Sequence, residues 1–133
     1  MIEHQTQLRV RYAETDQMQF AHHSSYIIWF EYARIELMRW LGINYAQMER
    51  DGYLLPVLEV KAQFHRAAHF DEPLALKTFI RRKPRAKLLF DYEIIDETGR
   101  LLCSGYSLHT FMNAEGRAVK PPKFFMEALR RYF

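Results

Sequence analysis

The sequence has only one cysteine, Cys103, and only five glycines and five prolines among its 133 residues. A single thiol cannot form an internal disulfide, which excludes a disulfide scaffold and favours a reducing, cytoplasmic environment. No apolar run reaches the roughly 18 residues that a membrane-spanning helix needs, and the N-terminus lacks a signal-peptide core, so no membrane partner is expected. Because no linker, repeat or low-complexity tract interrupts the chain, we expect a single domain over residues 1–133.

Acidic residues are absent from one stretch of the chain, between Glu72 and Asp91. This stretch carries a net charge of +6 while the whole chain carries +3, so the remaining residues carry −3. A local cluster of positive charge favours an anion-binding segment or a solvated loop over a nucleic-acid-binding surface, and we expect no nucleic-acid partner. The basic residues of the stretch are Lys77, Arg81, Arg82, Lys83, Arg85 and Lys87.

Hydrophobic periodicity predicts an α+β fold. Residues alternate between apolar and polar in five segments, which predicts strands at 5–12, 58–70, 74–82, 88–96 and 101–112. A helix is expected from Ser24 or Ser25 to Leu41, and it has apolar residues on nearly every side, so we expect it to be enclosed on most of its surface. Four consecutive strands after this helix predict an antiparallel sheet that wraps around it, with short helices at 44–50 and after Pro122.

Common metal and nucleophile patterns do not fit their predicted context. His65 and His69 have the i, i+4 spacing of a zinc site, but four residues span roughly 13 Å on a strand and cannot share one ion. Cys103 lies in a predicted strand, where a buried small side chain is the expected role. Ser24 and Ser25 are expected to cap the long helix. We therefore expect no metal site.

An acidic residue, Asp16, stands seven residues before His23, close to the predicted start of the long helix. Free backbone N–H groups and the positive end of the helix dipole gather at such a start and can bind a developing oxyanion. A carboxylate nearby can act as a general base or a nucleophile. The spacing also allows Asp16 to be an ordinary turn or capping residue.

The segment RYAETDQMQFAHHSSY at 11–26, followed by WFEYAR at 29–34, resembles the signature of hotdog-fold acyl-CoA thioesterases of the 4-hydroxybenzoyl-CoA thioesterase type. The segment FHRAAHFDEPL at 64–74 resembles the second block of that family, and the similarity extends over essentially the whole chain. The resemblance implies a hotdog fold, a curved antiparallel sheet wrapped around a long central helix. It also implies hydrolysis of an acyl-CoA to the free acid and CoA, with no metal or prosthetic group.

The resemblance assigns roles to individual residues. Asp16 would be the catalytic carboxylate, as nucleophile or general base, and the backbone N–H of His23 would form the oxyanion hole. The side chains of His23 and Tyr26 would line the site, and Glu31 would either face the substrate or pair with Arg34. The basic segment would bind the phosphates of CoA through Arg82, Lys83, Arg85 and Lys87. The alternative for this segment is a solvated hairpin tip.

The family forms dimers, often paired into tetramers, with active sites at the dimer interface, so the resemblance implies a homo-oligomer. Two positions depart from its pattern: Gln19 stands where glycine is usual, and Ser25 where asparagine is frequent. The first departure leaves the geometry of the Asp16 loop open, since glycine permits a tight turn. Two alternatives therefore stay open: a hotdog dehydratase or hydratase acting on an acyl thioester, and a non-catalytic acyl-CoA-binding protein.

Overall fold

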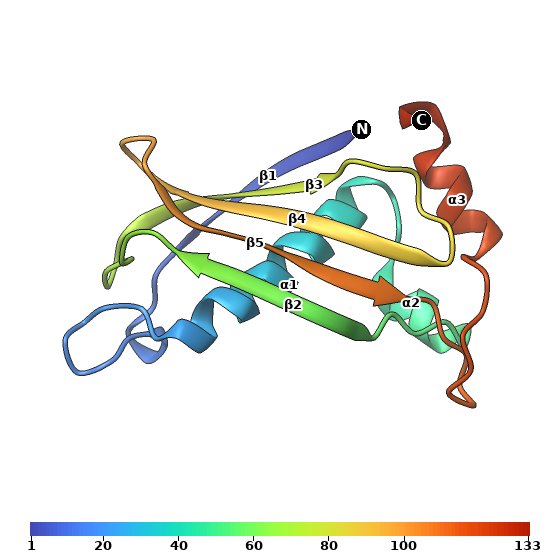
Figure 1. Ribbon diagram of the computed structural model, residues 1–133, viewed down its shortest axis with the longest axis horizontal. Helices are drawn as coiled ribbons and strands as arrows, with labels where there is room; N and C mark the ends of the chain where they lie inside the picture. Colours follow the sequence, from blue (N-terminus) through green and yellow to red (C-terminus); the bar gives the residue numbers. More distant parts are fainter.

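The computed structural model describes residues 1–133 and contains one five-stranded antiparallel sheet in the order β1-β3-β4-β5-β2 (Figure 1). The strands are β1 (Ile2–Arg9), β2 (Val57–Phe64), β3 (Pro73–Ile80), β4 (Lys87–Asp96) and β5 (Leu101–Thr110). The helices are α1 (His23–Trp40), α2 (Tyr45–Arg50) and α3 (Lys123–Leu129), with short 3-10 turns η1 (Tyr12–Glu14) and η2 (Arg130–Tyr132). The long helix α1 lies against one face of the sheet, and the predicted α+β hotdog fold is confirmed.

Large apolar side chains hold α1 against the sheet. Trp29, Phe30 and Leu37 are at most 1% exposed, and the ring of Phe30 stacks on Tyr92 of β4 with a centroid separation of 4.3 Å. Each such side chain stabilises the fold by roughly 1.5–3 kcal/mol through the area it removes from water. The helix begins with His22 as its N-cap, slightly earlier than the predicted serines. None of the helices is long and apolar enough to cross a membrane.

One side of α1 is open in the single chain. Ile28 is 56% exposed and Tyr32 is 40% exposed, which corrects the expectation that the chain encloses this helix on most sides. The edge strand β2 is open as well: Val60 and Phe64 are 42% and 52% exposed. Val60 pairs in register with the buried Ser107 of β5, so its side chain belongs to the sheet face that covers α1. Apolar surface is therefore left uncovered along the β2 edge.

Four strands end earlier than the alternation predicts, β3 and β5 by two residues and the other two by more. β1 spans residues 2–9 instead of 5–12, because Tyr12 already belongs to the turn η1. β2 ends at residue 64 instead of 70, because the N–H groups of His65 and Arg66 both donate to the carbonyl of Leu102, at 2.8 and 3.1 Å. These two hydrogen bonds to one carbonyl oxygen turn the chain away from β5 and toward the start of α1.

Gly105 marks the point where α1 and β2 both approach β5. A Cβ at this position would lie 3.0 Å from the ring of Phe30 and 2.0 Å from the backbone oxygen of Lys61. That oxygen cannot withdraw without loosening the β2–β5 pairing, so we expect Gly105→Ala to lower the free energy of unfolding by about 3 kcal/mol. Urea unfolding measures the effect, with Thr110→Ala on the same strand as the control. An unchanged midpoint for Gly105→Ala would contradict the close packing described here.

Candidate active site

The loop between η1 and α1 holds Asp16 through its own backbone. Oδ1 of Asp16 accepts the N–H groups of Met18 and Phe20, at 2.8 and 3.2 Å. The Asp16 N–H donates to the Phe20 carbonyl at 2.8 Å, and the Gln19 N–H donates to the Asp16 carbonyl at 3.0 Å. These bonds occupy Oδ1, whereas Oδ2 has no hydrogen-bond partner within the chain. One carboxylate oxygen is thus fixed and the other is free to react.

Gln19 adopts a left-handed backbone conformation, with φ at 65°. This region costs an L-residue with a side chain about 1–2 kcal/mol. Glycine avoids that cost, which explains why it suits this position in the resembled family. The turn nevertheless forms in this chain, and the hydrogen bonds around Asp16 hold it closed.

The start of α1 presents a backbone donor to this loop. The N–H of His23 has no acceptor within the chain, while the N–H of Ser24 donates to Nδ1 of His22 at 3.2 Å and the N–H of Ser25 donates to the His22 carbonyl at 2.9 Å. His22 donates its own N–H to the Glu14 carbonyl at 2.8 Å. A free N–H at the positive end of an 18-residue helix is an arrangement that stabilises an oxyanion.

A cleft of about 330 Å³ joins the Asp16 loop, the start of α1 and the end of β2. Tyr26 is 3% exposed, and its hydroxyl accepts the N–H of Ala68 at 3.0 Å. Burial raises the pKa of this phenol, so the hydroxyl is protonated at neutral pH. Three of the predicted site residues thus share one cleft, whose lining is Asp16, Phe20, Ala21, His23, Tyr26, Phe64, His65, Arg66 and Ala67.

The cleft also contains two side chains with ring or guanidinium nitrogens that the sequence does not predict as site residues, His65 and Arg66. In the sequence, His65 stands out only as half of a metal-like His spacing. In the structure its Nε2 lies 2.8 Å from Oγ of Ser104, a contact that orients the ring. Their place in the cleft follows from the early end of β2, which the alternation of side chains did not reveal. No cluster of three or more His, Cys, Asp or Glu side chains is arranged to hold a metal ion.

Glu31 lies outside the Asp16 cleft. Its side chain is 62% exposed, and its carboxylate lies 3.9 Å from Nη2 of Arg34. It lines a separate groove between α1 and β1. The structure therefore places Glu31 in the pairing with Arg34, one of the two roles considered, and away from Asp16.

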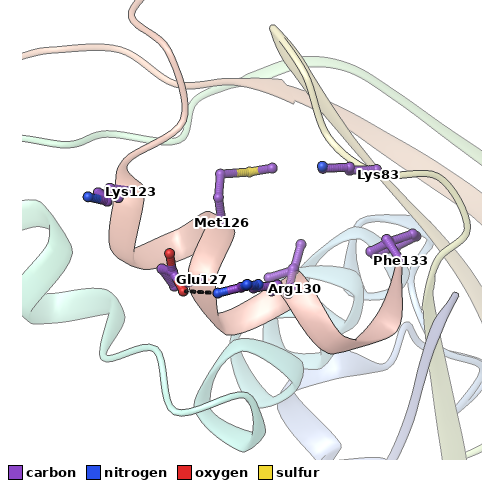
Figure 2. A pocket seen from close by; sticks show the side chains of 7 residues that line it. Lys83, Lys123, Met126, Glu127, Arg130 and Phe133 are labelled. Carbon is purple, nitrogen blue, oxygen red and sulfur yellow. Dashed lines mark ion pairs between the residues drawn. The ribbon is translucent and has the colours of Figure 1, made fainter.

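The basic β3–β4 loop lies at the other end of the sheet from Asp16, as the register of β1 and β3 requires. Over an eight-residue strand this separation is roughly 25 Å. Lys83 points toward Met126 of α3, above a pocket of about 260 Å³ that Arg130 also lines (Figure 2). Within one chain, the structure does not bring to Asp16 the predicted CoA-binding residues Arg82, Lys83, Arg85 and Lys87.

A serine–histidine pair lies elsewhere, in the core between the sheet and α1. Oγ of Ser107 is 2.7 Å from Nε2 of His109, and the hydroxyl of Tyr92 also contacts Ser107. Ser107 and His109 are 1% and 0% exposed, so no substrate reaches the hydroxyl. This pair satisfies buried polar groups and is not a second nucleophile.

We expect His109 to make the protein less stable in mild acid. Burial, and then the charge of Arg34, lower the pKa of His109 from 6.5 to about 4. The unfolded chain therefore takes up a proton near pH 6.5 that the folded chain refuses until about pH 4, and the free energy of unfolding falls as the pH drops through this window. The loss between about pH 7 and about pH 5 is about 2 kcal/mol.

Urea unfolding at these two pH values measures that loss. His109→Gln should be less stable at neutral pH but should lose less stability on acidification, because it has no imidazole to protonate. His23→Gln replaces an exposed histidine whose ring makes no hydrogen bond within the chain, and it is the control. An equal pH dependence in His109→Gln and in the wild type would show that another group is responsible.

The comparisons with known proteins agree with this architecture. A five-stranded antiparallel sheet wrapped around one long helix is the hotdog fold, and several relatives of the chain carry the names of thioesterases. The profile of the thioesterase-like superfamily matches residues 10–129, and the chain belongs to this superfamily.

Three relatives illustrate the similarity. YneP of Bacillus subtilis (strain 168), named for an inferred acyl-CoA thioesterase activity, is 33% identical over 118 residues, which are 89% of this chain and 84% of YneP. The crystal structure of TT1821 from Thermus thermophilus, called a hypothetical protein, has 34% identity and a TM-score of 0.90, covering 97% of this chain and 98% of that one. DHNA-CoA thioesterase from Staphylococcus aureus has 29% identity and a TM-score of 0.93, covering 99% and 91%.

The subtype within the superfamily is not distinguished by the fold. Solved structures named for gentisyl-CoA thioesterase and 4-hydroxybenzoyl-CoA thioesterase have TM-scores of 0.86 and 0.84. Their sequence identities of 20% and 18% indicate a shared fold alone. The resemblance to the superfamily is confirmed, whereas the 4-hydroxybenzoyl subtype stays a prediction.

Proposed function

We propose that this chain hydrolyses an acyl-CoA thioester to the free acid and CoA. The observation that carries the proposal is the shared cleft of Asp16, with one unpaired carboxylate oxygen, and His23, with an unpaired backbone N–H. The relative named for acyl-CoA thioesterase activity and the structure named for DHNA-CoA thioesterase support a CoA thioester as the substrate class. No metal or prosthetic group takes part in this proposal.

In the proposed reaction the thioester carbonyl oxygen accepts the His23 N–H. Negative charge grows on this oxygen as the carbonyl carbon becomes tetrahedral, and the N–H and the helix dipole stabilise it. Oδ2 of Asp16 either attacks the carbon, giving an acyl anhydride that water then cleaves, or takes a proton from the attacking water. In both routes the carbon–sulfur bond breaks and the acid is released. The CoA thiolate leaves and takes up the proton that the consumed water gives up, so the products are the acid and the CoA thiol.

We infer that the working unit is a dimer joined along β2. An edge strand has unpaired N–H and C=O groups, and this one also leaves Val60 and Phe64 partly exposed on the face toward α1. Pairing β2 with β2 of a second copy satisfies these groups and extends the sheet over both helices. Because Phe64 lines the Asp16 cleft, the second copy would border the site.

A dimer of this kind also gives the basic loop a use. In an antiparallel β2–β2 pair, the N-terminal end of one strand lies beside the C-terminal end of the other. The β3–β4 loop of the second copy therefore lies at the same end of the joined sheet as Asp16 of the first copy. We propose that this loop binds CoA phosphates across the dimer, since guanidinium and ammonium groups suit phosphate. The residues concerned are Arg82, Lys83, Arg85 and Lys87.

Release of free thiol tests the proposed function. The purified protein is incubated with short-chain, long-chain and aromatic acyl-CoAs and with enoyl-CoAs, and free CoA is measured. Turnover with thiol release is the expected result. Hydration of an enoyl-CoA without thiol release would overturn the proposal in favour of a hydratase, and tight CoA binding without any turnover would overturn it in favour of a binding protein.

A further inference from the structure

Glu14 lies two residues before Asp16, in the turn η1, and its side chain reaches back to α1. The side chain is 10% exposed. Oε2 accepts the indole N–H of Trp29 at 2.8 Å and lies 3.1 Å from Nη2 of Arg11, while Oε1 accepts the Arg11 backbone N–H at 2.7 Å. Both carboxylate oxygens therefore accept hydrogen bonds, which offset the free-energy cost of burying the charged group.

The backbone of Glu14 makes a second set of contacts with α1. Its carbonyl accepts the His22 N–H and the hydroxyl of Ser25, both at 2.8 Å. These two donors stand on either side of His23. Through its side chain and its backbone, Glu14 is thus hydrogen-bonded to three positions at or near the start of α1, and it stands directly before the Asp16 loop. These positions are His22, Ser25 and Trp29.

Trp29 makes this connection rigid. It is 1% exposed and its ring packs edge-on against Tyr26, with a centroid separation of 4.9 Å, so its indole nitrogen is held in place by the core. A hydrogen bond to a carboxylate is roughly twice as strong as a neutral one, so Glu14 holds the loop to this point more firmly than an amide would. The Arg11 side chain holds Glu14 much less firmly. It is 76% exposed, and an exposed ion pair contributes little to stability.

We propose that Glu14 is a positioning residue for the hydrolysis: it holds the Asp16 carboxylate in register with the His23 N–H. This inference rests on the proposed function of Asp16. Glu14 itself does not line the Asp16 cleft, so it acts through the loop and not on the substrate. A displacement of about 1 Å between reacting groups can cost about 100-fold in rate, so even a partial release of the loop should lower kcat.

Steady-state kinetics of three variants test the proposal. Glu14→Gln weakens every side-chain contact but keeps the shape, and Trp29→Phe removes the indole donor but keeps an aromatic ring. Both should lower kcat by about tenfold or more and change KM by less than about twofold, because the substrate-binding surface is intact. Arg11→Gln keeps its backbone N–H and should retain kcat within about twofold, which makes it the matched control.

The double variant separates positioning from general loss of stability. Because Glu14→Gln and Trp29→Phe remove the same contact, their combined effect on kcat should be smaller than the product of the two single effects. Urea unfolding must show that each variant is folded under assay conditions. Wild-type kcat in a folded Glu14→Gln variant would overturn the inference about Glu14. The proposed function would still stand in that case if the Asp16→Asn variant were inactive. Full activity in Asp16→Asn would overturn both.

Discussion

Replacing Asp16 with asparagine should lower kcat by at least about 100-fold and leave the fold intact. The asparagine side chain has the same shape, and its Oδ1 can still accept the N–H groups of Met18 and Phe20 that close the loop. What it loses is the reactive oxygen, since an amide neither attacks a thioester nor takes a proton from water at neutral pH. The measurement is thiol release with the best acyl-CoA substrate, together with the urea midpoint.

Asp71→Asn is the control for this experiment. Asp71 is another exposed carboxylate in a loop, it also has a positive φ, of 66°, and asparagine tolerates that conformation. It should retain kcat within about twofold. If Asp16→Asn stayed within about threefold of the wild type, the reaction would have to depend on another group of the cleft, and the chemistry proposed for Oδ2 would be wrong.

The features that the sequence reveals are those set by residues close together in the chain. The apolar pattern of α1 and the alternation in the strands are local, and the four consecutive strands leave few ways to build a sheet. The juxtaposition of Asp16 and His23 also falls in this class, because only seven positions separate them and a helix start lies between. The resemblance to the thioesterase family adds roles to these residues, but the spacing alone places a carboxylate near the positive end of a helix dipole.

Features that depend on distant contacts were missed. The end of β2 follows from the carbonyl of Leu102, far along the chain from His65, and the alternation beyond residue 64 gives no sign of it. The connection from Glu14 to Trp29 is also invisible in the sequence, because a tryptophan in an apolar helix indicates only packing. The basic loop shows the same limit at a larger scale: its distance from Asp16 within one chain depends on strand direction, and its proposed use depends on a second copy.

A dimer joined along β2 explains the open edge strand but not the open side of α1. The periodicity of α1 predicts a helix with little polar surface, yet Ile28 and Tyr32 are exposed in one chain. Extending the sheet across β2 would cover Val60 and Phe64, whereas Ile28 and Tyr32 line the groove between α1 and β1, at the other edge of the sheet. The expectation of an enclosed helix is therefore wrong for the single chain, and the proposed dimer accounts for the exposed side chains of β2 only.

We therefore expect Val60→Lys to convert a dimer into a monomer and to lower kcat/KM by at least about tenfold. Val60 lies in the middle of β2, faces α1, and pairs in register with Ser107 on its own chain. In the proposed dimer an ammonium group there would be buried without a partner, which costs several kcal/mol, and lysine on an edge strand is a common device against sheet extension. In the monomer the same side chain reaches water, so the fold should survive.

Sedimentation velocity at micromolar protein and thiol release at the same concentration measure the two effects together. Lys61→Gln alters the next residue, on the opposite face of the same strand, and should leave both assembly and activity unchanged. A wild type that sediments as a monomer, or a Val60→Lys variant that is dimeric and fully active, would exclude the β2 interface. Loss of activity in a monomeric, folded variant would mean that one chain supplies only part of each site, because the mutated position lies on β2 outside the lining of the Asp16 cleft.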